Sequence, residues 1–324
     1  MKFLQNSLIA CLWICGMVHA ADPLPSWNEG QVKSALLTFI AEAQTEGSPG
    51  FIEPGDRIAV FDNDGCLWSE QPMYFQLFFM ADRVKALAAD HPEWKTTQPF
   101  QAILEEDHDT VKAFGHAELL EIAMATHSGM SEEEFAAIVR DWTATAVHPE
   151  TGKRFLDMTY QPMKELLQAL RDAGFKTYIV SGGGLSFIRP WSEEVYGIPP
   201  EQVIGSRVKV EYKVTEEGGN VMRLPEIDHI DDKEGKPVGI YQVIGKRPAF
   251  AAGNSDGDFQ MLEYTTTGQG PRFGLYVHHT DAEREWAYDR DSHVGKLDRG
   301  LDEADERGWV VADMARDWKT IYGE

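Results

Sequence analysis

Two carboxylates stand two positions apart, at Asp62 and Asp64, directly after the apolar run 57–61. On an irregular loop at the end of a buried strand, both side chains could face one pocket. Asp, Asn and Gly are also common turn residues, so a plain turn is the alternative interpretation. The pair gains weight only if other functional groups reach the same place.

A second polar cluster, after the apolar run 248–252, supplies further oxygen ligands at Asn254, Asp256 and Asp258. Several carboxylates in one pocket repel each other and raise one another's pKa values, and a divalent cation removes that penalty. Oxygen ligands without Cys or His suit Mg²⁺ better than Zn²⁺. The cluster therefore predicts a magnesium site, with a solvated acidic loop as the alternative.

A third cluster, after the apolar run 175–180, offers the Ser181 hydroxyl and the unhindered backbone of Gly182. A helix that begins at Leu185 would add positive potential from its N-terminus. Lys236, just before a short helical segment, could complete the positive side. We interpret these groups as a candidate phosphate-binding site, although most glycine triplets are turns and most lysines are solvated.

These clusters need a scaffold that brings strand ends together. Short apolar runs at 57–61, 175–180, 248–252 and 273–277 predict buried strands, and they alternate with helical patterns such as 31–43 and 161–173. This order predicts an α/β fold with a Rossmann-like parallel sheet flanked by helices. In such sheets, functional loops lie at the carboxyl ends of the strands.

Residues 71–140 differ from this pattern because they are helical with few strand signals, and we interpret them as a helical insert. Helices are expected over 107–124 and 131–142. Ser131 followed by Glu134 forms a capping-box pattern at the start of the second one. Residues 203–214 alternate like a strand, and the Gly-rich turn at 217–220 predicts a hairpin.

Together these elements resemble the haloacid dehalogenase superfamily of phosphotransferases. The resemblance is carried by four motifs in the family's order: residues 60–67 (VFDNDGCL), residues 180–183 (VSGG), Lys236, and residues 253–262 (GNSDGDFQML). The insert is similar to the cap of the phosphoserine-phosphatase-like branch. We therefore expect a signal peptide at 1–20, a catalytic core at 21–67 and 160–324, and an α-helical cap at 68–159.

The resemblance implies a role for each matched residue. Asp62 is expected to attack phosphorus and form an aspartyl-phosphate, and Asp64 to act as general acid and then general base. Mg²⁺ is the implied cofactor. The implied metal ligands are Asp62, Asp64, Asn254 and Asp258. The implied phosphate-binding residues are Ser181, Gly182 and Lys236.

The sequence also departs from the family pattern. Asn254 stands where an Asp ligand is common, so either Asp256 or Asp258 is expected to compensate. Lys246 is an alternative to Lys236, but it lies too close to the strand that begins at 248. An acid at Asp64 favours phosphoryl transfer over carbon–halogen hydrolysis.

Glu70 follows the first motif, where the chain crosses into the insert. It is a possible contact for a cationic part of the substrate. The alternative interpretation is a surface or hinge carboxylate, since neither its position nor its neighbours specify a ligand.

Composition and the N-terminus indicate partners and location. The formal net charge of −23 disfavours nucleic acid and anionic membranes as partners. Lys2 gives a positively charged start, and residues 7–18 are apolar apart from Ser7. Residues 18–20 offer small residues for cleavage, so this pattern predicts a signal peptide and a periplasmic or secreted protein without stable membrane insertion. A lipoprotein box at Cys11 and an uncleaved anchor are alternatives. Cys66 is the one cysteine outside residues 1–20, so the mature chain has no internal disulfide.

The function expected from these residues is an exported, Mg²⁺-dependent phosphatase that hydrolyses a small phosphorylated metabolite. Two alternatives use the same residues differently. The first is a phosphotransferase or pyrophosphatase. The second is a non-catalytic periplasmic protein that binds a phosphate ligand or a metal, which Asn254 at a ligand position would suit.

Overall fold

The computed structural model describes residues 21–216 and 218–323, so the expected signal peptide at 1–20 lies outside the described residues. Its framework is a seven-stranded sheet in the order β4-β3-β2-β1-β5-β6-β7. The strands are β1 (Ile58–Phe61), β2 (Lys176–Gly184), β3 (Val203–Thr215), β4 (Gly218–His229), β5 (Phe250–Gly253), β6 (Phe273–His278) and β7 (Val310–Asp313).

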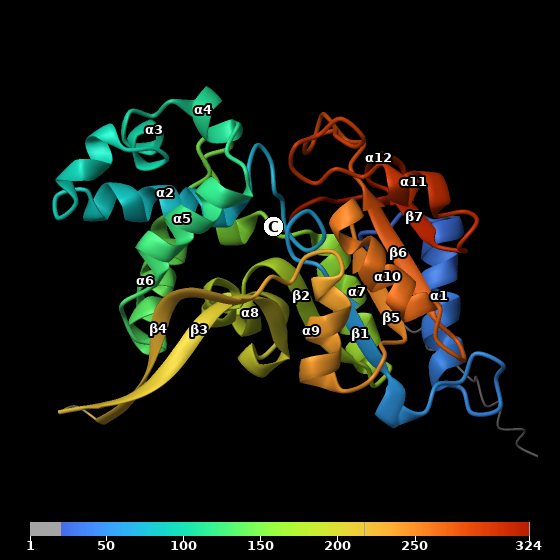
Figure 1. Ribbon diagram of the computed structural model, residues 1–324. Helices are drawn as coiled ribbons and strands as arrows, with labels where there is room; N and C mark the ends of the chain where they lie inside the picture. The colour runs from blue at the N-terminus through green and yellow to red at the C-terminus, as the bar shows by residue number, and fades with distance from the viewer. Residues whose placement is uncertain (1–20, 217, 324) are drawn as a thin grey trace, which may run out of the picture.

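Twelve α-helices accompany these strands in the described part of the chain (Figure 1). They are α1 (Gln31–Gln44), α2 (Phe75–Leu87), α3 (Phe100–Leu104), α4 (His108–Lys112), α5 (His116–His127), α6 (Glu132–Thr145), α7 (Gln161–Asp172), α8 (Leu185–Tyr196), α9 (Gly235–Ile244), α10 (Phe259–Thr266), α11 (Arg299–Glu303) and α12 (Met314–Asp317). Within the described ranges, no helix is long and apolar enough to span a bilayer.

The central strands pair in parallel, as predicted. β1 lies between β2 and β5, with Phe61 opposite Ile179 on one side and Ala252 on the other. Each residue of β1 is buried, because helices cover both faces of the sheet. The predicted α/β class with a parallel, helix-flanked sheet is confirmed, and the register brings the carboxyl ends of β1, β2 and β5 to one edge.

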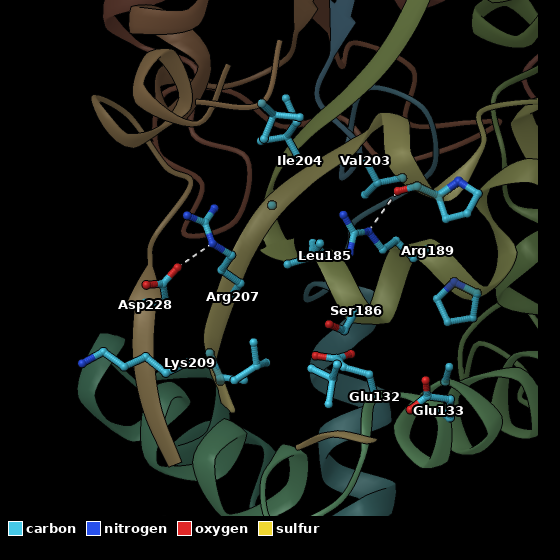
Figure 2. A pocket seen from close by; sticks show the side chains of 18 of the residues that line it. Glu132, Glu133, Leu185, Ser186, Arg189, Val203, Ile204, Arg207, Lys209 and Asp228 are labelled. Carbon is cyan, nitrogen blue, oxygen red and sulfur yellow. Dashed lines mark hydrogen bonds and ion pairs between the residues drawn. The ribbon is translucent and has the colours of Figure 1, made fainter. Parts of the chain in front are cut away.

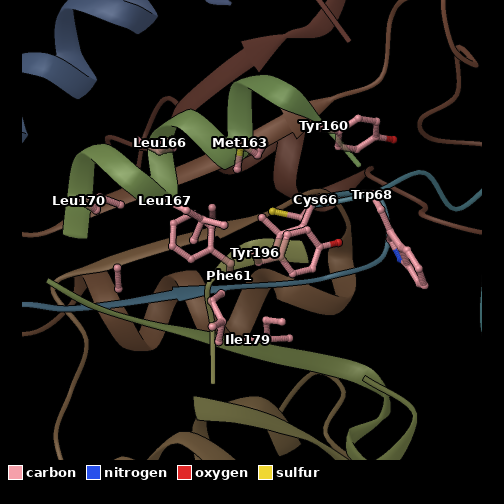
Figure 3. Close-up of a cluster of buried hydrophobic side chains, with 14 of the residues drawn as sticks. Phe61, Cys66, Trp68, Tyr160, Met163, Leu166, Leu167, Leu170, Ile179 and Tyr196 are labelled. Atoms are coloured by element: carbon pink, nitrogen blue, oxygen red, sulfur yellow. The ribbon is translucent and has the colours of Figure 1, made fainter. Parts of the chain in front are cut away.

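Alternate residues of the central strands enter two different cores. Phe61 and Ile179 pack against α7, whose apolar face holds Leu166 and Leu170 (Figure 3). The amphipathic pattern that predicts this helix ends at Gly174, which has a φ of +83° and stops the helix as expected. Neighbouring strand residues, such as Val60, face the opposite core under α9 and α10.

The insert after β1 is helical, as expected, and comprises α2 to α6; α7 follows it and leads into β2 (Figure 1). The single helix predicted over 107–124 is wrong in detail, because the helix stops after α4 and restarts at α5, with Gly115 as the N-cap residue. The capping box at α6 forms as predicted. The Ser131 hydroxyl accepts from the Glu134 amide, and the Glu134 carboxylate accepts from the Ser131 amide.

The β3–β4 hairpin forms as predicted, but it also reaches the helical insert (Figure 1). The Arg223 amide donates to the Met130 carbonyl over 2.9 Å. The Arg223 guanidinium donates to the carbonyl of His127 and, over 2.7 Å, to the Glu132 carboxylate. The hairpin thus holds α5 and α6 from the side opposite to α2.

Candidate active site

A buried ion-pair cluster lies at the carboxyl end of β1. The Lys236 ammonium donates to Asp62 Oδ1 over 2.6 Å and to Asp258 Oδ1 over 2.5 Å. It also donates to the Val180 carbonyl at 2.9 Å. Burial and the negative charge of Asp258 raise the pKa of Asp62, while the ammonium opposes that shift. One lysine thus forms ion pairs with two carboxylates and fixes the position of both.

Lys236 reaches this position because it lies in the first turn of α9, which begins at Gly235 directly above the carboxyl ends of β1 and β2. Lys246, the alternative at the sequence level, lies elsewhere. Its ammonium is exposed and pairs with Asp56 at 2.7 Å, near the amino end of β1. The structure therefore brings Lys236, and not Lys246, to Asp62.

The loop after β5 separates the three oxygen-bearing residues predicted there. Asp256 accepts backbone hydrogen bonds from residues 298–300 and so faces away from Asp62. Asp258 faces Asp62, but Lys236 occupies its Oδ1, and its Oδ2 accepts from the Asn254 and Ser255 amides at 3.0 and 3.1 Å. Asp258 thereby holds the loop and Lys236. Its ligation of a metal stays a prediction.

Asn254 presents a buried side-chain oxygen without a hydrogen-bond partner among the described residues. Its Nδ2 donates to Glu70 Oε1 over 2.7 Å, so the amide orientation leaves Oδ1 for another ligand. Residues 21–216 and 218–323 contain no ready cluster of three His, Cys, Asp or Glu side chains for a metal. An amide oxygen beside carboxylates nevertheless fits the oxygen ligands that Mg²⁺ prefers.

Glu70 is almost fully buried, which excludes the surface carboxylate considered above. Besides Asn254, its Oε1 accepts from the Tyr288 hydroxyl at 2.8 Å. The carboxylates of Asp62, Asp64, Glu70 and Asp258 thus act on one another, and the Lys236 ammonium pairs with two of them, Asp62 and Asp258. Burial of this excess negative charge is costly unless a cation or protons compensate.

Asp64 is fixed by a residue that the sequence did not single out as functional. The indole of Trp68 donates to Asp64 Oδ1 over 2.8 Å, and the ring stacks on Trp191 with 4.7 Å between the ring centroids. Desolvation in the cleft raises the pKa of Asp64 to about 6, an effect that the Trp68 hydrogen bond opposes. A carboxyl group with such a pKa can exchange a proton near neutral pH.

The Ser181–Gly184 end of β2 lines the other side. The Ser181 hydroxyl is buried and accepts from the Gly183 amide at 3.0 Å. The Gly184 amide donates to Gln76 of α2 at 2.8 Å, and α8 begins at Leu185 as expected. Space is tightest at Gly184, where an added Cβ would lie 2.9 Å from Gln76 Nε2.

A cleft with a volume of about 370 Å³ joins these groups and extends between the sheet edge and the helical insert. Among the residues predicted to act on a phosphate ester, Asp62, Asp64, Glu70, Gly182 and Lys236 line it. Ser181, Asn254 and Asp258 lie behind this wall, hydrogen-bonded to it or to the neighbouring backbone.

Sequence reasoning did not identify three of the surrounding residues. Gln76 links the insert to the Gly184 amide, and Tyr288 holds Glu70. His279 is buried, and its ring contacts the Gly65 carbonyl at 2.8 Å. The aromatic and polar patterns around these positions carry no signal beyond that of ordinary packing, so only the fold reveals them.

A second, larger cavity of about 1270 Å³ lies between the β3–β4 hairpin and α8 (Figure 2). Arg207 pairs there with Asp228 at 2.6 Å, and Arg189 donates to the Pro200 carbonyl at 2.9 Å. Figure 2 shows Lys209 on β3, beyond Arg207 along the same strand. No predicted catalytic, metal-binding or phosphate-binding residue lines this groove within the described chain.

Comparison with known proteins gives one family match. A family model described as haloacid dehalogenase-like hydrolase matches residues 59–263, which include all four motifs. No curated protein matches the sequence.

Several solved structures are similar to this chain at low sequence identity. A protein with unknown function from Bordetella pertussis is 17% identical, covers 80% of this chain and 98% of its own, and has a TM-score of 0.48. A conserved functionally unknown protein from Anaerococcus prevotii is 18% identical over 77% and 86% of the chains, with a TM-score of 0.47. A phosphoserine phosphohydrolase-like protein from Francisella tularensis is 17% identical over 68% and 87%, with a TM-score of 0.37.

Proposed function

The chain belongs to the haloacid dehalogenase-like hydrolases, and from this premise we propose that it is a Mg²⁺-dependent phosphomonoesterase with Asp62 as nucleophile. The observation that carries the proposal is the convergence of Asp62, Asp64, Lys236 and Gly182 in one cleft, with Lys236 Nζ 2.6 Å from Asp62 Oδ1. Such a cleft offers a nucleophile, a proton donor and positive charge for one phosphoryl group.

In the first step, a carboxylate oxygen of Asp62 attacks phosphorus and the ester P–O bond breaks. The proton of Asp64 passes to the leaving alcohol oxygen. Asp62 then carries the phosphoryl group as an acyl phosphate. The Lys236 ammonium and the backbone amides after Ser181 stabilise the negative charge on the phosphoryl oxygens.

In the second step, a water molecule attacks the same phosphorus atom and Asp64 accepts one of its protons. The bond between Asp62 and phosphorus breaks, which releases inorganic phosphate and restores the free carboxylate. Trp68 keeps Asp64 in place for both proton transfers through its 2.8 Å hydrogen bond. General acid–base help of this kind is worth about 10²–10⁴-fold in rate.

The groups that would hold Mg²⁺ are the Asp62 carboxylate, the Asp64 backbone carbonyl, and Asn254 and Asp258 of the fourth motif. The buried, unpartnered Asn254 Oδ1 and the excess of carboxylates support this assignment. When bound, the cation supplies charge neutralisation that lets Asp62 stay ionised and brings the anionic ester close.

The test uses the mature protein with an aryl phosphate and Mg²⁺. We expect release of inorganic phosphate that chelator abolishes and added Mg²⁺ restores. Asp62→Asn removes the nucleophile and is expected to reduce kcat by at least about 10³-fold, since no other carboxylate occupies its position. Phosphate release that survives this substitution contradicts the mechanism.

A control variant separates loss of chemistry from loss of folding. Asp56→Asn changes an exposed aspartate near the amino end of the same strand, which pairs with Lys246. It is expected to retain the activity of the unmodified protein. Thermal unfolding of both variants then shows whether Asp62→Asn remains folded.

We also propose that the protein is exported, on the strength of the apolar residues 7–18 and the small residues before position 21. Expression of the full chain with fractionation of the cells tests this proposal. We expect the periplasmic or external fraction to contain a chain whose N-terminal sequence begins at Ala21. An intact N-terminus in the cytosol contradicts export.

A further inference from the structure

The far wall of the catalytic cleft is apolar. Beyond Asp62 and Asp64 the cleft continues to side chains from α2, α5, α8 and β4. They are Leu77, Met80, Leu120, Met124, Phe187 and Ile227. An ester bound through its phosphate at the sheet edge would place its alcohol portion against these side chains.

The polar groups on this wall already have partners. Gln76 accepts from the Gly184 amide, and the Arg223 guanidinium is held by the His127 carbonyl and the Glu132 carboxylate. The His127 ring contacts Gln76 and the Thr126 hydroxyl, and burial lowers its pKa to about 3, so it is neutral. Of the other charged residues that line the cleft, Arg207 is paired with Asp228 at 2.6 Å, and Asp232 lies beside Gly182 at the sheet edge. A charged leaving group against the apolar wall would therefore lose its hydration without gaining a counter-ion there.

Resting on the proposed function, we propose that the leaving group is an apolar alcohol or phenol rather than a zwitterion such as serine or choline. Burial of the leaving group then supplies the specificity through the hydrophobic effect. Each methylene group that enters the cleft is expected to raise kcat/KM about fourfold until the cavity is full.

A homologous series of n-alkyl phosphates tests this inference. We expect kcat/KM to rise from ethyl to butyl to hexyl phosphate, and to exceed the values for O-phosphoserine and phosphocholine. A flat series, or a preference for either zwitterion, overturns the inference but leaves the proposed function standing if aryl phosphate is hydrolysed. Absence of turnover with every ester overturns both.

Variants locate the effect. Leu120→Asn places an amide on the half-buried wall of α5 and is expected to flatten the dependence on chain length. Val147→Asn changes an exposed apolar residue outside the cleft and is expected to keep the slope. Equal slopes in both variants contradict the placement of the alkyl chain against α5.

A different observation supports a second inference, at the back of the cleft. Glu70 and Asn254 meet where three loops converge without space for further side chains. A Cβ added to Gly65 would lie 2.1 Å from Asn254 Nδ2, and one added to Gly295 would lie 1.8 Å from Glu70 Oε1. Both glycines have positive φ, of +71° and +66°. The side chains of Glu70 and Asn254 therefore lie in a closely packed space bounded by the backbone of Gly65 and Gly295.

The close packing around Asn254 matters because its amide group has an acceptor oxygen and a donor nitrogen, which are not interchangeable. Asn254 can offer a cation its oxygen only if its nitrogen points elsewhere, whereas an aspartate offers an oxygen in either orientation. Glu70 Oε1 accepts from Asn254 Nδ2 at 2.7 Å, and Tyr288 donates to the same Oε1 at 2.8 Å. We infer that Glu70 is a positioning residue that makes Asn254 usable as a metal ligand in place of an aspartate.

Calorimetric binding of Mg²⁺ to the otherwise unliganded protein tests this role without recourse to activity. Glu70→Leu is expected to weaken Mg²⁺ binding roughly 10- to 100-fold, as for other residues that orient metal ligands. Glu70→Gln retains an acceptor oxygen and is expected to lose less. Tyr288→Phe is the matched control, because it removes the other hydrogen bond of Glu70 and leaves the one to Asn254.

The deciding measurement combines Glu70→Leu with Asn254→Asp. Because aspartate needs no orientation, Glu70→Leu is expected to weaken Mg²⁺ binding much less in a chain that already carries Asn254→Asp than in the unmodified chain. Equal losses in the two chains overturn the inference. Unfolding of each variant is followed by circular dichroism, and if Glu70→Leu does not fold, Glu70→Ala, which also lacks an acceptor oxygen, replaces it in the same cycle with the same criterion.

Discussion

Two lysines of this protein each pair with carboxylates, yet their surroundings differ. The Lys236 side chain in the catalytic cluster is 2% exposed and has two carboxylate partners, whereas that of Lys209 beside the groove of Figure 2 is 46% exposed and pairs with Glu226. Water screens the second pair and hardly reaches the first. The burial of an ion pair, rather than the number of such pairs, therefore determines how much it affects the stability of this protein.

Removal of the buried ammonium gives the largest expected effect. Lys236→Met leaves Asp62 and Asp258 buried without a cation, so we expect the free energy of unfolding to fall by about 3–5 kcal/mol in chelator. We also expect kcat to fall by about 10²–10³-fold, because a donor to the phosphoryl oxygens is lost. Denaturant unfolding and phosphate release measure the two effects. An unchanged free energy of unfolding would show that water solvates Asp62 and Asp258 in the folded protein.

A buried histidine extends the comparison to acid pH. Burial, and then the charges of Arg223 and Arg83, lower the pKa of His127 to about 3, below its usual 6.5. The unfolded chain therefore binds the proton first, and stability is lost as the pH falls from about 6.5 towards 3. This one group contributes up to about 1.4 kcal/mol per pH unit, or about 3 kcal/mol by pH 4.

His127→Gln checks this expectation, because the amide does not titrate. Its free energy of unfolding should decline less steeply than that of the unmodified protein between pH 6.5 and 4. His91→Gln, at an exposed histidine, serves as the control and should leave the slope unchanged. Parallel curves for all three proteins would mean that His127 binds its proton in the folded state.

The hydrogen bond from Trp68 to Asp64 should have an intermediate effect. Trp68→Phe keeps an aromatic ring but removes the indole donor, so we expect a loss of about 2 kcal/mol in stability. We expect kcat/KM to fall about tenfold, because Asp64 is no longer held for proton transfer. Steady-state kinetics and thermal unfolding measure the two. Full activity after the substitution would show that Asp64 is positioned by other contacts.

The exposed pair gives the smallest expected effect and completes the comparison. Lys209→Gln breaks the ion pair with Glu226 on the hairpin, where both side chains contact solvent. We expect the free energy of unfolding to change by less than about 0.5 kcal/mol and kcat to stay unchanged. A loss as large as that of Lys236→Met would remove the distinction between the two regions.

The elements that position the cleft were predictable because their signals are local. A run of four apolar residues before Asp62 specifies β1, and the pattern after Lys236 specifies α9. Once strands alternate with helices, the handedness and pairing of a parallel sheet bring their ends together. The placement of Asp62 and Lys236 side by side follows from that topology.

Other features depend on contacts between distant segments, which leave no local pattern. β7 is a four-residue strand at the edge of the sheet that no functional motif follows, and the sequence analysis did not assign it. Tyr288 and Gly295 reach Glu70 from a long loop after β6. Nothing in the alternation of β4 indicates that Arg223 will bind the insert rather than face solvent. Packing against α5 and α6 determines its orientation.

The contact of Arg223 with the insert has a consequence for the order of synthesis. Helices α5 and α6 emerge from the ribosome about 70 residues or more before β4, so their full set of contacts forms only after β4 has been made. Native contacts between such distant segments raise the contact order and slow folding. During synthesis, the insert therefore lacks its contacts with Arg223 until the hairpin in the second half of the chain has been made.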